Sequence, residues 1–108
     1  MSAIGADVDG AALKKVFPKL VEGLEVVNVI DELYANDLLS SEEYEGILHA
    51  CMQTSSKEDS RNVNRRMLMA IRRRPPGFVA KLVVILRKKH KSLANALEMG
   101  EWCCNVLL

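Results

Sequence analysis

Apolar residues recur every three or four positions along most of this chain, which is the spacing of amphipathic helices rather than strands. The first such stretch begins at Asp9, a residue type that favours the N-cap of a helix, and ends near Gly23. Pro18 lies inside it, where proline removes a backbone donor and clashes with the preceding turn. The pattern therefore predicts a first helix that is bent near Phe17. Its inward positions are Leu13, Val16, Phe17, Leu20 and Leu24.

Two further helices are predicted between residues 26 and 52. The first covers residues 26–35, is acidic on its outer side, and has as apolar positions Val26, Val27, Ile30, Leu33 and Tyr34. After a turn, Ser40 and Glu43 have the spacing of a capping box, in which each side chain binds the backbone N–H of the other. A third helix therefore starts near Ser41, and its inward residues are Tyr44, Ile47, Leu48 and Cys51.

The second half of the chain predicts three more helices. A polar connector, residues 53–59, precedes a helix whose core positions are Val63, Met67, Leu68, Met69 and Ile71. The Pro-Pro-Gly sequence at residues 75–77 ends this helix, because proline forces the residue before it out of the helical region. Residues 78–88 are apolar on most sides, including Val79 and Val84, and predict a buried helix. Residues 92–99 predict a short last helix, followed by Gly100 as the C′ residue.

Length and composition fit one all-α domain. The chain has 108 residues, of which 49% are hydrophobic and only 5% aromatic, enough for one core. We expect an N-terminal arm (residues 1–8), a helical bundle (residues 9–100) and a C-terminal tail (residues 101–108). No apolar run has the length of a membrane span and no basic leader precedes the first helix, so neither export nor membrane insertion is indicated.

No catalytic, metal or cofactor site is predicted. The chain has no glycine-rich phosphate loop, no Gly-x-Ser-x-Gly elbow, and no cysteine with a suitable histidine and carboxylate. His49 and His90 are isolated, and the three cysteines lack metal-ligand spacing. Reduced thiols in the cytoplasm fit this cysteine content best. For Cys103 and Cys104, packing against a partner and lipid attachment both stay open.

Charge is distributed unequally along the sequence. Residues 1–59 hold four lysines and twelve acidic residues, a net charge of −8, whereas residues 60–108 hold eleven basic and two acidic residues, a net charge of +9. Such asymmetry is typical of an acidic tail, of a nucleic-acid-binding patch, or of two complementary surfaces through which copies attract each other.

Several stretches together resemble one known family. Residues 20–24 (LVEGL), 29–33 (VIDEL) and 37–47 (DLLSSEEYEGI) are similar to the first three helices of the caspase recruitment domain, a member of the death-fold superfamily. Residues 65–71 (RRMLMAI) and 93–97 (LANAL) are similar to its fourth and last helices, and the fifth helix is matched by Phe78, Leu82 and Leu86. The resemblance extends from about residue 11 to residue 98.

The resemblance implies a six-helix antiparallel Greek-key bundle with two oppositely charged faces. The basic face belongs to the first and fourth helices, and the resemblance assigns to it Lys19, Arg61 and Arg65, to which charge alone adds Lys14, Lys15 and Arg66. The acidic face belongs to the second and third helices, and the resemblance assigns to it Asp31, Glu42 and Glu43, to which charge alone adds Glu32 and Asp37.

The functional hypothesis is a module for binding other caspase recruitment domains in apoptotic or inflammatory signalling. Its partners would be a caspase, sensor or adaptor of the family, and further copies of itself, because two complementary faces on one molecule propagate head to tail into an oligomer or filament. The alternative is a basic helical nucleic-acid-binding domain that uses residues 72–74 and 87–89. The charged side chains also have purely structural interpretations, since they solvate helix faces and Glu43 can serve as a cap.

Overall fold

Six helices, and no strand, make up the part of the chain that the structure describes. The computed structural model describes the backbone of residues 8–107 and the side chains of residues 9–99. In chain order the helices are α2 (Val8–Gly23), α3 (Val26–Ala35), α4 (Ser41–Met52), α5 (Lys57–Arg72), α6 (Phe78–Lys89) and α7 (Lys91–Leu107). The predicted all-helical, six-helix fold is confirmed.

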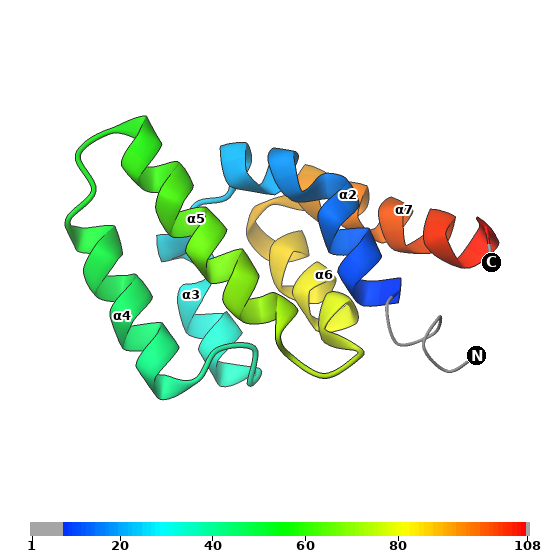
Figure 1. Ribbon diagram of the computed structural model, residues 1–108, viewed down its shortest axis with the longest axis horizontal. Helices are drawn as coiled ribbons and strands as arrows, with labels where there is room; N and C mark the ends of the chain where they lie inside the picture. The colour runs from blue at the N-terminus through cyan, green and yellow to red at the C-terminus, as the bar shows by residue number, and fades with distance from the viewer. Residues whose placement is uncertain (1–7, 108) are drawn as a thin grey trace.

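Helix α2 is continuous through Pro18, and its axis changes direction along its length in Figure 1. The bent first helix is therefore present, but the role predicted for Asp9 is wrong. Asp9 lies within the first turn of α2, and its carboxylate accepts hydrogen bonds from the backbone N–H groups of Gly77 and Val79. The carboxylate caps the N-terminus of α6, where the helix dipole favours a negative charge. The backbone at residue 77 has a φ of 104°, a left-handed conformation that glycine adopts without strain.

Side-chain caps start the two helices that follow α3. The Ser40 hydroxyl accepts from the N–H of Glu43 at 3.1 Å, and the Glu43 carboxylate accepts from the N–H of Ser40 at 2.8 Å, which confirms the predicted capping box. In the same way, the Ser56 hydroxyl accepts from the N–H of Asp59 at 3.1 Å. Helix α5 therefore begins at Lys57, inside the segment that the sequence predicted to be a connector.

The predicted end of the last helix is also wrong. Helix α7 continues through Gly100 to Leu107, whereas the sequence predicted its end at Met99. A glycine inside a helix costs only about 1 kcal/mol relative to alanine, so it does not by itself end one. The division into arm, bundle and tail stays a prediction, and residues 1–7 and 108 lie outside the described residues.

The core contains side chains from all six helices and from the turn after α3. Its largest fully buried side chains are Leu13, Leu20, Ile30, Leu33, Leu38, Ile47, Met67, Leu68, Ile71, Leu82, Leu86 and Leu97. Four apolar side chains that the sequence placed inside the core are exposed instead, namely Val27, Tyr34, Met69 and Val84. The buried side of α3 consists of Val26, Val29, Ile30 and Leu33, and Val27 and Tyr34 lie on its exposed side.

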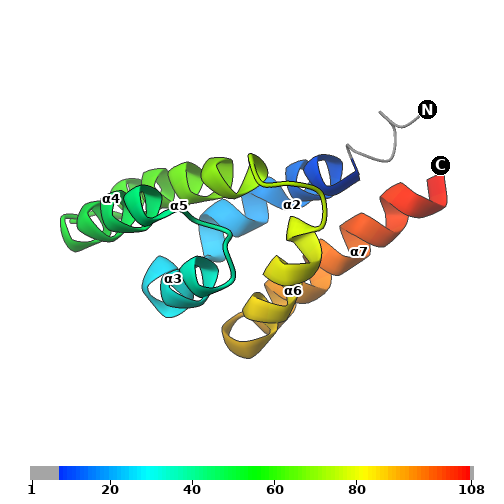
Figure 2. The same ribbon diagram turned by 90° about the horizontal axis from the view of Figure 1, so that it is seen from below.

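The helices are not arranged in sequence order. Helix α2 packs against α5, α6 and α7, while α3 packs against α4 and α6. Figures 1 and 2 show α4 and α5 side by side at one end of the molecule and the C-terminal part of α7 at the other. Helix α4 packs mainly against α3 and α5, so α3 and α4 lie at an edge of the bundle.

Candidate protein-interaction surfaces

Two arginines of the predicted basic face are bound to carboxylates of the same chain. Arg61 Nε lies 2.8 Å from Glu22 Oε1 on α2, and Arg61 Nη1 lies 3.3 Å from Glu58 Oε1. Arg65 Nη1 lies 3.4 Å from the other oxygen of Glu58. The hydrogen bonds that Arg61 donates to Glu22 and, to a smaller extent, to Glu58 raise the pKa of Arg61. The charge of this part of the basic face is therefore partly neutralised within the molecule.

Arg65 is the more accessible of these two arginines. Its side chain is 45% exposed, compared with 33% for Arg61. Arg61 joins α5 to α2 through Glu22, whereas Arg65 makes its shortest contact within its own helix, at 2.7 Å to the side-chain oxygen of Asn62. A partner can reach Arg65 without separating α2 from α5.

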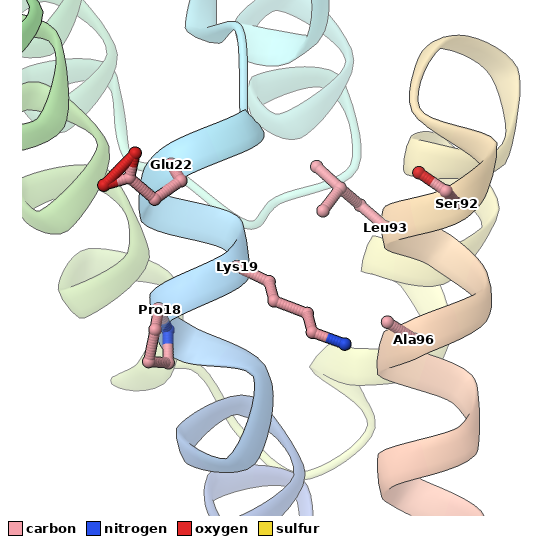
Figure 3. A pocket seen from close by; sticks show the side chains of 6 residues that line it. All are labelled: Pro18, Lys19, Glu22, Ser92, Leu93 and Ala96. Atoms are coloured by element: carbon pink, nitrogen blue, oxygen red, sulfur yellow. The ribbon is translucent and has the colours of Figure 1, made fainter.

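The predicted lysines of α2 are exposed but do not all point the same way. Lys14 and Lys15 are exposed in the first half of the helix. Lys19 extends across the gap between α2 and α7 toward Ala96, as Figure 3 shows. It lines a groove of about 500 Å³ together with Pro18, Glu22, Ser92, Leu93 and Ala96. Lys19 therefore lies on the side of α2 that faces α7.

Arg66 lies on a different side of α5, against α4. Its Nη2 atom is 3.0 Å from the position that a Cβ atom at Gly46 would occupy, so the glycine leaves room for the guanidinium. Arg66 also lines a cavity of about 260 Å³ with Glu42, Glu43 and Arg73. The structure thus places this basic residue among acidic ones.

Two carboxylates of the predicted acidic face have partners inside the domain. Glu43 caps α4, and its carboxylate lies 3.3 Å from Arg74 and 3.8 Å from Arg73, with a side chain only 20% exposed. Glu32 lies 3.1 Å from Lys88 on α6. Both residues therefore have structural roles that do not depend on binding another molecule.

The other three carboxylates, those of Asp31, Asp37 and Glu42, are exposed and form no ion pair with any described residue. Asp37 has a φ of 64° in the turn after α3, a conformation that aspartate tolerates better than most residues. Asp31 lies on α3, and its Oδ1 atom accepts a 2.7 Å hydrogen bond from the hydroxyl of Tyr44 on α4. Asp31 and Glu42 are thus the members of the predicted acidic face that are accessible on these two helices.

Two tyrosines, which we call the tyrosine pair, lie beside Asp31. The ring centroids of Tyr34 and Tyr44 are 4.9 Å apart and the rings are tilted by 33°. The Tyr34 hydroxyl is 3.1 Å from the hydroxyl of Ser41. The hydrogen bond to Asp31 is the main reason that the pKa of Tyr44 is raised. Sequence reasoning placed both rings on inward sides and missed this surface, although Asp31 and Tyr34 have the spacing of neighbours on one helix face.

The ion pairs partly offset the charge segregation along the sequence. Most of those among the described residues join an acidic residue before position 60 to a basic residue after it. The basic runs behind the nucleic-acid alternative take part, since Arg73, Arg74 and Lys88 pair with acidic residues of the first half and Arg87 pairs with Glu98. This internal neutralisation lowers the positive potential available to a phosphate backbone.

Three further observations concern membranes, metals and thiols. None of the helices in residues 8–107 combines the length and apolar character that crossing a bilayer requires. Within the described residues, no three His, Cys, Asp or Glu side chains lie close enough together to hold a metal ion. Cys51 is a free thiol whose pKa is raised by burial, and the side chains of Cys103 and Cys104 lie outside the described residues.

The fold and these surfaces define an all-helical domain of the death-fold class. The family model of the caspase recruitment domain matches residues 11–100, and the chain therefore belongs to that family. Searches among curated proteins and among solved structures give no significant match. The family consists of protein-interaction modules of apoptotic and inflammatory signalling rather than of catalytic domains, and the predicted resemblance is confirmed.

Proposed function

We propose that this domain binds the caspase recruitment domains of a caspase, sensor or adaptor, and further copies of itself, by docking its basic face onto an acidic face. The proposal rests on family membership and on the presence of exposed, oppositely charged groups on different helices. We choose Arg65 on α5 and Asp31 on α3 to represent the two faces, because Arg65 is more exposed than Arg61 and Asp31 has no ion-pair partner among the described residues. We place this activity in the cytoplasm, where the free thiol of Cys51 would stay reduced.

The exposed carboxylate of Asp31 is the observation that carries the proposal. Glu32 and Glu43 have basic partners within the domain, whereas Asp31 accepts a hydrogen bond from the Tyr44 hydroxyl and has no cationic partner among the described residues. An arginine from another molecule can supply the missing cation through charge-assisted hydrogen bonds. Exposed ion pairs contribute only about 1 kcal/mol or less, so the pair must become desolvated at the centre of the contact to matter.

Two faces of opposite charge on one molecule give a heterologous contact. Such a contact closes into a ring or continues as a helical filament, depending on the rotation between successive copies. Each added copy again presents one free basic face and one free acidic face. A copy that can use only one of the faces therefore ends the assembly after a single contact.

Two single-face variants test the proposal. Asp31→Asn removes the acidic charge and leaves the basic face, and Arg65→Gln does the reverse; we call them the basic-only and acidic-only copies. The unmodified protein should scatter light above a threshold concentration, and each variant alone should stay monomeric in sedimentation velocity. A mixture of the two should form a 1:1 heterodimer.

A matched control separates the loss of this contact from a general change in charge. Lys89→Gln removes an exposed charge on α6 and should assemble like the unmodified protein. Circular dichroism must show the same helical content in every variant. If both single-face variants still assemble alone, the two faces do not mediate self-association. A chain that stays monomeric but suppresses the assembly of a family partner acts as a decoy.

A further inference from the structure

The tyrosine pair gives the acidic face a feature that charge alone does not. Tyr34 is 43% exposed, and one side of its ring packs against Tyr44. Asp31 precedes Tyr34 by three residues on α3, so the carboxylate and the ring lie on the same side of the helix. A carboxylate and an aromatic ring side by side can bind one flat cation simultaneously.

Hydrogen bonds hold each part of this arrangement in place. The Tyr44 hydroxyl donates to Asp31 Oδ1 at 2.7 Å, and the Tyr34 hydroxyl is 3.1 Å from Ser41 Oγ on α4. The second oxygen of Asp31 has no hydrogen-bond partner among the described residues. Less side-chain entropy is lost on binding when the acceptor groups are already fixed.

We propose that the tyrosine pair and Asp31 form a receptor for a single arginine side chain, and that its occupant is Arg65 of a second copy of this chain. This inference rests on the proposed function and specifies the chemistry of its acidic face. The guanidinium stacks on the exposed part of the Tyr34 ring and donates to the unpartnered oxygen of Asp31. The charge complementarity between the exposed Asp31 and the 45% exposed Arg65 supports this occupant.

Arginine suits this receptor better than lysine does. Its guanidinium is planar, stacks on aromatic rings and presents several donors in a rigid fork, whereas the ammonium of lysine is compact and strongly hydrated. The receptor should therefore distinguish two side chains of equal charge. Selectivity for arginine over lysine distinguishes a specific arginine receptor from a surface that is merely acidic.

The affinity between the basic-only and acidic-only copies measures this selectivity at one interface. Tyr34→Leu in the acidic-only copy keeps an apolar side chain and removes the ring, and should weaken binding about fivefold in isothermal titration calorimetry. Arg65→Lys in the basic-only copy should weaken binding by a similar factor. Tyr44→Phe keeps the ring but removes the donor to Asp31, and should weaken binding about threefold.

Combining the substitutions tests for direct contact. If Arg65 stacks on Tyr34, the effect of Arg65→Lys should largely disappear once Tyr34 is leucine. Val84→Ala, at an exposed apolar position on α6, is the control and should leave the affinity unchanged. Circular dichroism and thermal unfolding check that each variant is folded.

Failure of this inference is distinguishable from failure of the proposed function. Suppose that the single-face copies form a heterodimer, but that Tyr34→Leu leaves the affinity unchanged or lowers it equally with arginine and with lysine at position 65. The receptor is then wrong, and the docking of opposite faces stands. If the single-face copies form no heterodimer at all, the proposed function fails together with the receptor.

Discussion

The α2–α5 side and the α3–α4 side of this domain treat their charges in different ways. On the first, Arg61 and Arg65 are bound to Glu22 and Glu58, so the basic groups are compensated by acids of the same chain. On the second, Asp31 is exposed, and its one side-chain hydrogen bond among the described residues comes from a neutral tyrosine hydroxyl. A partner therefore meets a partly neutralised basic face and an unneutralised acid on the other side.

This difference shows that charge content does not measure charge available for binding. The carboxylate of Glu43 lies against two arginines and caps a helix, so its charge is already compensated within the fold. The carboxylate of Asp31 has no such cation among the described residues. Residues of the same type, and in the same half of the sequence, therefore differ in what they offer to a partner.

The largest expected effect compares these two kinds of acidic residue. In the acidic-only copy, adding Asp31→Asn should weaken binding to the basic-only copy more than about tenfold, because a charge at the contact loses its counterpart. Adding Glu32→Gln should change the affinity less than about twofold, because Glu32 already pairs with Lys88. Equal losses for the two, measured by calorimetry, would mean that general negative charge attracts the partner.

The next effect concerns stability on the α2–α5 side. Asn64 is 3% exposed, and its side-chain amide donates to the carbonyls of Val21 at 2.8 Å and Leu24 at 3.0 Å. Asn64→Ala would leave both carbonyls at the end of α2 unsatisfied and should lower the free energy of unfolding by about 2 kcal/mol in urea titrations. Asn62, an exposed residue of the same helix, provides the control: Asn62→Ala should lower the free energy of unfolding much less. Equal urea midpoints for the two variants would contradict this role.

A smaller effect tests whether Glu58 competes with the partner. Glu58→Gln in the basic-only copy frees Arg61 and Arg65 from a shared carboxylate and should strengthen heterodimer formation about twofold to threefold. The gain should shrink as salt is added, because screening weakens exposed ion pairs. Unchanged or weaker binding at low salt would show that Glu58 does not mask the basic face.

Much of the local structure was predictable from the sequence because it depends on neighbouring residues. The capping box of Ser40 and Glu43, the start of α4 and the break at residues 75–77 all follow from short-range chemistry. The continuation of α7 through Gly100 was missed, because a glycine signals an end only when the chain actually turns there.

The compensation of charges was not predictable in this way. Arg61 and Glu22 are 39 residues apart, and their contact depends on how α5 packs against α2. The capping of α6 by Asp9 likewise joins residues nearly 70 positions apart. Periodicity indicates that a residue is on a helix but fixes its facing direction only loosely, which is why the sequence placed Tyr34 inside and the structure exposes it.

The smallest expected effect is a pH dependence at the start of α5. Hydrogen bonds from the backbone N–H and then the hydroxyl of Ser55 lower the pKa of Asp59. Stabilisation from a carboxyl with a lowered pKa is present above its ordinary value and is lost as the pH falls through the lower, folded-state value. As the pH falls below the ordinary range of an aspartate pKa, Asp59→Asn should therefore lose less stability than the unmodified protein in thermal unfolding. The exposed carboxyl of Glu45 is the control, and a Glu45→Gln variant should follow the unmodified protein.

Exchanging the charges of the two faces tests the central claim most directly. Arg65→Glu and Asp31→Arg each place like charges at the contact, so each variant alone should be monomeric in sedimentation velocity. Mixed together, the new glutamate can pair with the new arginine while the unmodified faces also pair, so assembly should return in the mixture alone. Assembly of either variant by itself, or monomers in the mixture with both variants folded, would contradict docking between Arg65 and Asp31.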